Sequence, residues 1–163
     1  KRYGAAKVII HGGYNPYIYY PNWYVEQSVL FWKEFVQEIP EDMVFCLENV
    51  FEEEPAMLTQ IVRQVNDPRI RMCLDVGHVN AYSKISVMEW LESCVDLTEH
   101  FHIHNNDSTA DCHCALFEGT IPMRDFLYRA EQLCPNATFT LELMEDGPSV
   151  AWLADNGLLE IEG

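Results

Sequence analysis

A histidine-rich stretch near the middle of the chain contains residue types that can bind a metal ion. Residues 101–108 read Phe-His-Ile-His-Asn-Asn-Asp-Ser, and Asp111 and His113 follow shortly after. If the first half is a strand, His102 and His104 share one face, because side chains alternate along a strand. The Asn- and Asp-rich continuation is typical of a loop. A single buried histidine is more often structural, but imidazoles and carboxylates together at a strand end suit Zn, Mn or Co.

Other short hydrophobic runs end in residues of the same chemical kind. Residues 7–10, 43–49, 70–78 and 137–143 are apolar, with several β-branched residues, which favours strands. In α/β proteins the chemistry gathers where parallel strands end. The polar residues at these ends are His11, Glu48, Asp75 with His78, and Glu142.

Segments with helical spacing separate these strands. Helices are predicted from Asn22 to the Ile39-Pro40 pair and over residues 53–65, 86–97, 122–133 and 149–156. Alternating strands and helices indicate a parallel sheet. A doubly wound sheet binds its ligand in one crevice between two strands, whereas here five strand ends carry ligand-type residues. That pattern favours a closed barrel. The predicted inward face of the first helix consists of Trp23, Val29, Leu30, Trp32, Phe35 and Val36.

Composition indicates a globular protein. The 163 residues suit one domain, residues 1–163, and 48% of them are hydrophobic. With 26 acidic and 10 basic residues the formal charge is −16, which disfavours binding to nucleic acid. No apolar run approaches the ~20 residues of a membrane span. We therefore expect no membrane partner and a cytoplasmic location, and association into a homo-oligomer is possible. The six cysteines fit neither a zinc-finger pattern nor a disulfide framework.

An ordered set of short motifs resembles one known family. The chain resembles the xylose isomerase-like TIM-barrel superfamily, which includes sugar phosphate isomerases and epimerases and AP endonucleases of the endonuclease IV type. The resemblance implies an α/β fold of the TIM (β/α)8 type. The family barrel needs ~250 residues, so this chain has room for about six βα units. These correspond to strands three to eight, with the N-terminal strands missing. The motifs are His11-Gly12-Gly13, Leu47-Glu48-Asn49, Leu74-Asp75-Val76-Gly77-His78, His102-Ile103-His104-Asn105-Asn106-Asp107, Asp111-Cys112-His113, Glu118-Gly119-Thr120-Ile121 and Leu141-Glu142.

The same resemblance implies a divalent metal held by four residues. They are Glu48, Asp75, His104 and Glu142. Three carboxylates and one imidazole favour Mn, Co, Zn or Mg.

Further residues match other sites of the family. His78, Asp111 and His113 match residues that hold an additional zinc in the endonuclease branch, and in the isomerase branch His78 binds substrate instead. His11 matches a ligand of a further zinc, whose partner histidine would precede residue 1.

The function implied is isomerisation or epimerisation of a small-molecule sugar, a keto-sugar or a sugar phosphate. Glu48 and Glu142 are the expected catalytic pair, which removes and returns a proton through a metal-stabilised enediolate. One alternative is a multi-zinc phosphodiesterase of the endonuclease IV type, which the −16 charge disfavours. The other is a non-catalytic barrel that binds a sugar. Few basic residues are available for a phosphate, which favours an unphosphorylated substrate.

Overall fold

Five parallel strands form one sheet in the order β1-β2-β3-β4-β5. The computed structural model describes residues 4–38 and 40–159. The strands span Lys7–His11 (β1), Val44–Glu48 (β2), Ile70–Asp75 (β3), Thr98–Ile103 (β4) and Thr138–Leu141 (β5). Each strand pairs with the next one along the chain, and every pair is parallel. All five strands therefore end at the same edge of the sheet.

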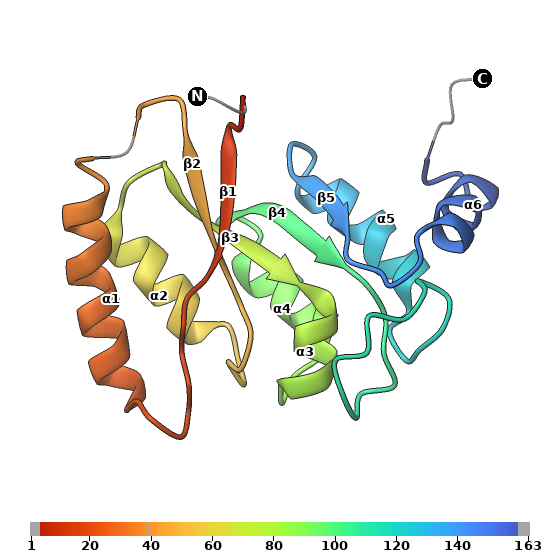
Figure 1. Ribbon diagram of the computed structural model, residues 1–163, viewed down its shortest axis with the longest axis horizontal. Helices are drawn as coiled ribbons and strands as arrows, with labels where there is room; N and C mark the ends of the chain where they lie inside the picture. The colour runs from red at the N-terminus through yellow and green to blue at the C-terminus, as the bar shows by residue number, and fades with distance from the viewer. Residues whose placement is uncertain (1–3, 39, 160–163) are drawn as a thin grey trace.

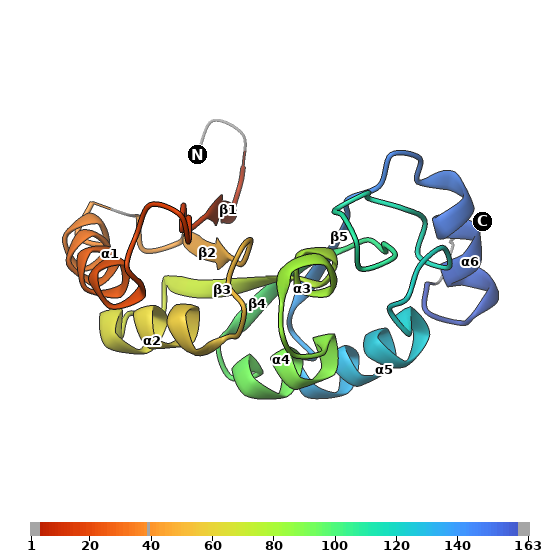
Figure 2. The same cartoon turned by 90° about the horizontal axis from the view of Figure 1, so that it is seen from below.

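The helices follow the strands in the expected alternation. They are α1 (Pro21–Phe35), α2 (Ala56–Val65), α3 (Val76–Tyr82), α4 (Val87–Cys94), α5 (Met123–Leu133) and α6 (Gly147–Asp155). Figure 2 shows the sheet curling, with α1, α2, α4 and α5 along its outer side. The fold is thus the predicted α/β type, a parallel sheet curled into a half-barrel. The described residues contain five strand–helix units, rather than the approximately six that the chain length allowed.

The main core lies between the sheet and these helices. It is built from the alternate strand residues that face outward, such as Leu47, Met72 and Phe101, and from the inner faces of the helices. Because alternate residues point to opposite faces, the residues between them face the concave side. Figure 1 shows β3 leading directly into α3 at the edge where the strands end.

Helices α3 and α1 differ most from the sequence prediction, and the predicted ends of α2 and α4 are each wrong by three residues at one terminus. Residues 76–78 were expected to continue the third strand, but α3 begins at Val76 because the Asp75 side chain accepts a hydrogen bond from the His78 backbone N–H at 2.7 Å and caps the helix. Helix α1 ends at Phe35, before the predicted Ile39-Pro40 end, and Ile39 itself lies outside the described residues. Among the described residues, no helix is both long and apolar enough to cross a membrane.

A long connection between β4 and α5 folds over the edge where the strands end (Figure 1). Asn105 holds it in place. Its side-chain amide donates to the carbonyl oxygens of Leu116 and Ile121, and its Oδ1 accepts from the backbone N–H of Ile121 at 3.1 Å. Gly119 packs against Asn105 so closely that a Cβ would lie 2.2 Å from Oδ1. This loop carries Asp111 and His113 to the strand ends.

Candidate metal centre

Four side chains from three strands and the segment after β5 converge at the carboxyl edge of the sheet. Glu48 ends β2, Asp75 ends β3, His102 lies near the end of β4, and Glu142 follows β5. One ligand atom from each lies within 4.8 Å of the others. The parallel register explains the convergence, because Asp75 is the direct partner of His102 across the β3–β4 pair.

The ring of His102 lies at the centre of this group. Its Nδ1 is 3.1 Å from Oε1 of Glu142, 3.3 Å from Oε1 of Glu48 and 3.8 Å from Oδ2 of Asp75. Glu48, Asp75 and His102 are buried, whereas Glu142 is about one-third exposed. Burial acts to lower the pKa of His102, but the adjacent carboxylates, Glu48 foremost, raise it overall. The three carboxylates around this imidazole therefore stabilise a positive charge at the centre of the group.

Two buried atoms at the centre of this group have no hydrogen-bond partner. They are Oε1 of Glu48 and Nδ1 of His102. A buried polar atom without a partner costs free energy. A divalent cation coordinated by both atoms would remove that cost, and a set of three carboxylates and one imidazole suits Mn, Co, Zn or Mg. The residues present therefore fit a metal ion.

The four-residue group contains His102, whereas the predicted ligand His104 belongs to a second group of ligand-type side chains, with His113 and Glu142. Nε2 of His104 lies 3.1 and 3.3 Å from the two carboxylate oxygens of Asp75 and is within hydrogen-bonding distance of both. Its ring stacks on His113 with a centroid distance of 4.1 Å and packs against Gly77, where a Cβ would lie 1.9 Å from Cε1. His102 and His104 do share the predicted face, but they are two residues apart, and the sheet register places His102 beside Asp75.

Asp75 is held by several neighbours. Asn49 donates to the backbone carbonyl of Asp75 and accepts from its backbone N–H, both at 2.9 Å. Burial acts to raise the pKa of Asp75, but the hydrogen bond from His104 and the charge of His78 lower it overall. Burial likewise acts to lower the pKa of His104, whereas Asp75 raises it overall. Asp75 is therefore held as a carboxylate, the form that binds a cation.

The structure also brings together His78, Asp111 and His113. Oδ2 of Asp111 lies 3.1 Å from Nε2 of His78 and 3.2 Å from Nε2 of His113. The other ring nitrogen of each histidine faces a backbone carbonyl, that of Asn49 at 2.9 Å and that of Glu142 at 2.7 Å. Both Nδ1 atoms must donate to these carbonyls, so each Nε2 points at Asp111. Histidines that bind metals typically have this arrangement.

The remaining predicted residue, His11, lies at the margin. Its Nε2 is 3.4 Å from Oε1 of Glu48, and its side chain is 62% exposed. Sequence reasoning missed the position of His102 in the four-residue group, although the His-x-His pattern contained it. It also missed Asn49, which follows Glu48 directly and whose contacts with Asp75 have no signature in the sequence.

Comparisons with known proteins agree with this architecture. The family model described as xylose isomerase-like TIM barrel matches residues 1–158. The chain shows no match to the curated proteins by sequence. Several solved structures are similar at low sequence identity, and these similarities show the fold.

One similar structure is a D-tagatose 3-epimerase-like protein, with a TM-score of 0.80 and 20% identity over 93% of this chain and 62% of that one. Another is the TTHB071 protein from Thermus thermophilus, soaked with ZnCl2, with a TM-score of 0.73 and 22% identity over 97% of this chain and 64% of that one. A third is 3-keto-D-glucoside 4-epimerase, YcjR, from E. coli, with a TM-score of 0.60 and 13% identity over 91% and 63%.

The chain thus spans less than two thirds of the length of these three structures. The family model, in contrast, covers nearly all of this chain, and the half-barrel and its strand order agree with it. The chain belongs to the xylose isomerase-like TIM barrel family.

Proposed function

We propose that the protein is a metal-dependent isomerase or epimerase that acts on a keto-sugar or a sugar phosphate. The observation that carries the proposal is the convergence of Glu48, at the end of β2, and Glu142, after β5, whose Oε1 atoms lie 3.3 and 3.1 Å from the same atom, Nδ1 of His102. Similar structures include a D-tagatose 3-epimerase-like protein and a 3-keto-D-glucoside 4-epimerase. Their chemistry is of the proposed class.

The two glutamates would act as acid and base. Epimerisation next to a carbonyl removes a proton from one face of a carbon and returns it to the other. Two carboxylates reaching one point from strands that are not neighbours can address both faces. A divalent cation held by Glu48, Asp75, His102 and Glu142 would polarise the carbonyl as a Lewis acid.

Other residues would keep Asp75 and Glu142 in place. His104 and Asn49 hold Asp75, and the backbone carbonyl of Glu142 accepts a hydrogen bond from Nδ1 of His113 at 2.7 Å. That bond ties the segment after β5 to the β4–α5 loop. The carboxylates, imidazoles and amides that surround the site favour a polyol without a phosphate.

Deuterium exchange tests the proposal directly. The protein is incubated with Mn2+ or Co2+ and a panel of ketoses in heavy water, and incorporation next to the carbonyl is followed by NMR. We expect exchange with the native chain and a loss of at least about 100-fold in Glu48→Gln and Glu142→Gln, as expected for removal of an acid–base group. Glu54→Gln, an exposed carboxylate on the loop that follows β2, is the matched control and should exchange normally.

A second candidate function is zinc-dependent phosphodiester hydrolysis of the endonuclease IV type. The contacts of Asp111 with His78 and His113 favour it, because such a group could hold an additional zinc. Hydrolysis of an abasic-site oligonucleotide without any ketose exchange would replace the isomerase proposal with this one. Specific binding of a ketose without either reaction would support a non-catalytic sugar-binding barrel.

A further inference from the structure

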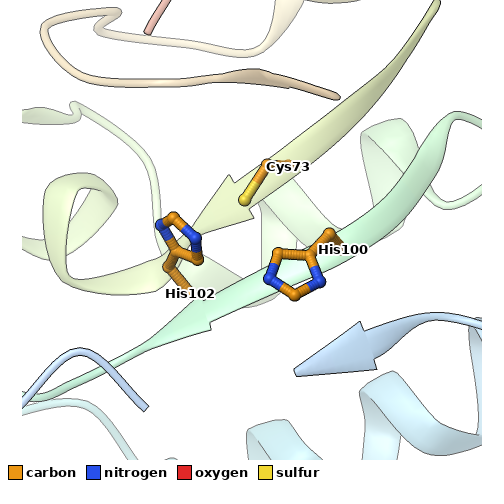
Figure 3. Close-up of side chains that lie close together, drawn as sticks. All are labelled: Cys73, His100 and His102. Atoms are coloured by element: carbon orange, nitrogen blue, oxygen red, sulfur yellow. The ribbon is translucent and has the colours of Figure 1, made fainter. Parts of the chain in front are cut away.

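A second group of ligand-type side chains lies below the carboxylate group on the concave face of the sheet. It consists of Cys73, His100 and His102, and one ligand atom from each lies within 4.8 Å of the others. Figure 3 shows the sulfur of Cys73, on β3, pointing toward the rings of the two histidines on β4. All three side chains are buried, and Cys73 is completely so.

The sheet register produces this group. Cys73 is the direct partner of His100, and Asp75 is the direct partner of His102. Because residues two apart share a face, Cys73 and His100 form the row of the concave face that precedes the row of Asp75 and His102. His102 thus belongs to two sets. The upper set, at the C-terminal ends of the strands, contains the carboxylates, and the lower set, one row earlier along the strands, contains Cys73 and His100.

The chemistry of the two sets differs. The upper set offers mainly carboxylate oxygens, which suit Mn and Mg as well as Zn and Co. A thiolate with two imidazoles is a softer set, of the kind that binds Zn2+ and also accepts Co2+ or Cd2+. The lower group is therefore expected to select a thiophilic ion.

Two hydroxyl groups already orient His100. Its Nδ1 lies 2.6 Å from Oγ1 of Thr138 and its Nε2 lies 3.0 Å from Oγ1 of Thr140. A hydroxyl both donates and accepts, so either ring nitrogen can give up its threonine while the other keeps its bond. A ligating histidine is usually fixed in this way by a bond from its second nitrogen.

The burial of the lower group is the next observation. The exposed fractions are 0% for Cys73, 8% for His100 and 6% for His102. A buried thiol beside two buried imidazoles, one of them oriented by hydroxyls, is more than a structural cysteine requires. We propose that Cys73, His100 and His102 form a binding site for Zn2+, separate from the carboxylate group and sharing only His102 with it.

Cobalt spectroscopy tests the proposal independently of the proposed enzyme activity. Cobalt bound through a thiolate absorbs in the near ultraviolet by sulfur-to-metal charge transfer, whereas cobalt held by carboxylates and imidazole does not. Co2+ is titrated into the full chain carrying Cys112→Ser and Cys114→Ser, because these two loop cysteines are the more exposed ones. We expect a charge-transfer band that Zn2+ abolishes by displacement.

Substitutions then assign the band. Cys73→Ser should abolish it, and His100→Gln should weaken cobalt binding by at least about 10-fold. Cys46→Ser is the matched control, since Cys46 is an equally buried thiol on β2 outside the group, and it should keep the band. If Cys73→Ser does not give a folded circular dichroism spectrum, Cys73→Ala replaces it, and His100→Gln provides the second test.

The absence of a charge-transfer band in the folded protein overturns the proposal, as does a band that survives the loss of Cys73. Failure of the isomerase proposal looks different, because it appears as absent deuterium exchange with the thiolate band unaffected.

Discussion

Nε2 of His104 lies 3.1 Å from Oδ1 of Asp75, and both side chains are completely buried. The other oxygen of Asp75 lies 3.8 Å from Nδ1 of His102. The two histidines of one His-x-His pattern thus lie near the same carboxylate. His104 is within hydrogen-bonding distance of Asp75, and His102 belongs with Asp75 to the four-residue group.

This arrangement predicts different effects of the two histidines on metal binding. His102→Gln should remove a ligand and abolish high-affinity binding of Mn2+. His104→Gln should lower the affinity by about 10- to 100-fold, which is typical for the loss of a residue that orients a ligand. Titration calorimetry on both variants measures the affinities. A larger loss in His104→Gln than in His102→Gln would instead assign His104 as the ligand.

Gly77 is predicted to be essential for the position of His104. A Cβ at residue 77 would lie 1.9 Å from Cε1 of His104. This is far shorter than a van der Waals contact, so Gly77→Ala must displace a buried ring. We expect a loss of about 1–3 kcal/mol in the free energy of unfolding, as for an overpacked core, measured by urea denaturation.

The matched control for that substitution is Gly147→Ala. Nothing lies within 4 Å of a Cβ at residue 147. Its effect should be within about 0.5 kcal/mol of zero. Equal effects of the two substitutions would contradict the close packing of Gly77 on His104.

Bound metal should stabilise the fold, because the carboxylates of the four-residue group lie close together and are mostly buried. At a free concentration 100 times Kd, an ion that binds only the folded state contributes about 2.7 kcal/mol. EDTA should therefore lower Tm, and the decrease should be much smaller in Glu142→Gln.

Metal content per chain, measured by plasma mass spectrometry after dialysis, separates the candidate functions. About one ion in a variant with Cys73→Ser and His100→Gln, reduced when Glu142→Gln is added, supports the isomerase. Two or three zinc ions support the hydrolase if a variant with Cys73→Ser and His100→Gln retains them. The absence of any metal in the folded protein would contradict both enzyme proposals.

The cysteines should differ in their reactivity toward iodoacetamide. Burial raises the pKa of Cys46 to about 12 and that of Cys94 to about 11, whereas Cys112 is exposed. The thiolate is the reactive form, so below the pKa of a thiol its reaction accelerates as the pH rises. Peptide mass spectrometry of the native protein at about pH 8, near the ordinary pKa of a thiol, should show alkylated Cys112 with Cys46 and Cys94 unmodified, and urea should expose all three. Early modification of Cys46 would contradict its placement in the core.

The sequence by itself determined the class of fold and indicated which side chains would meet at the strand ends. Alternating strands and helices predicted the parallel sheet, and polar residues at the strand ends predicted where Glu48, Asp75 and Glu142 would meet. This succeeded because strand and helix periods are local properties, and because parallel strands all end at one edge. The grouping of Asp111 with His78 and His113 was also implied by the family resemblance, which associated these residues in one site.

Only the tertiary structure shows how the two histidines lie relative to the carboxylates. His102 and His104 share a face, so periodicity cannot separate them, and the register between β3 and β4 alone places His102 beside Asp75. The start of α3 at Val76 depends on the side chain of Asp75, and the grouping of Cys73 with His100 depends on strand pairing. Leu30, predicted to face inward, is 64% exposed, because burial depends on what lies opposite a helix as well as on its own spacing. Contacts between distant segments are set by packing, and local sequence does not encode them.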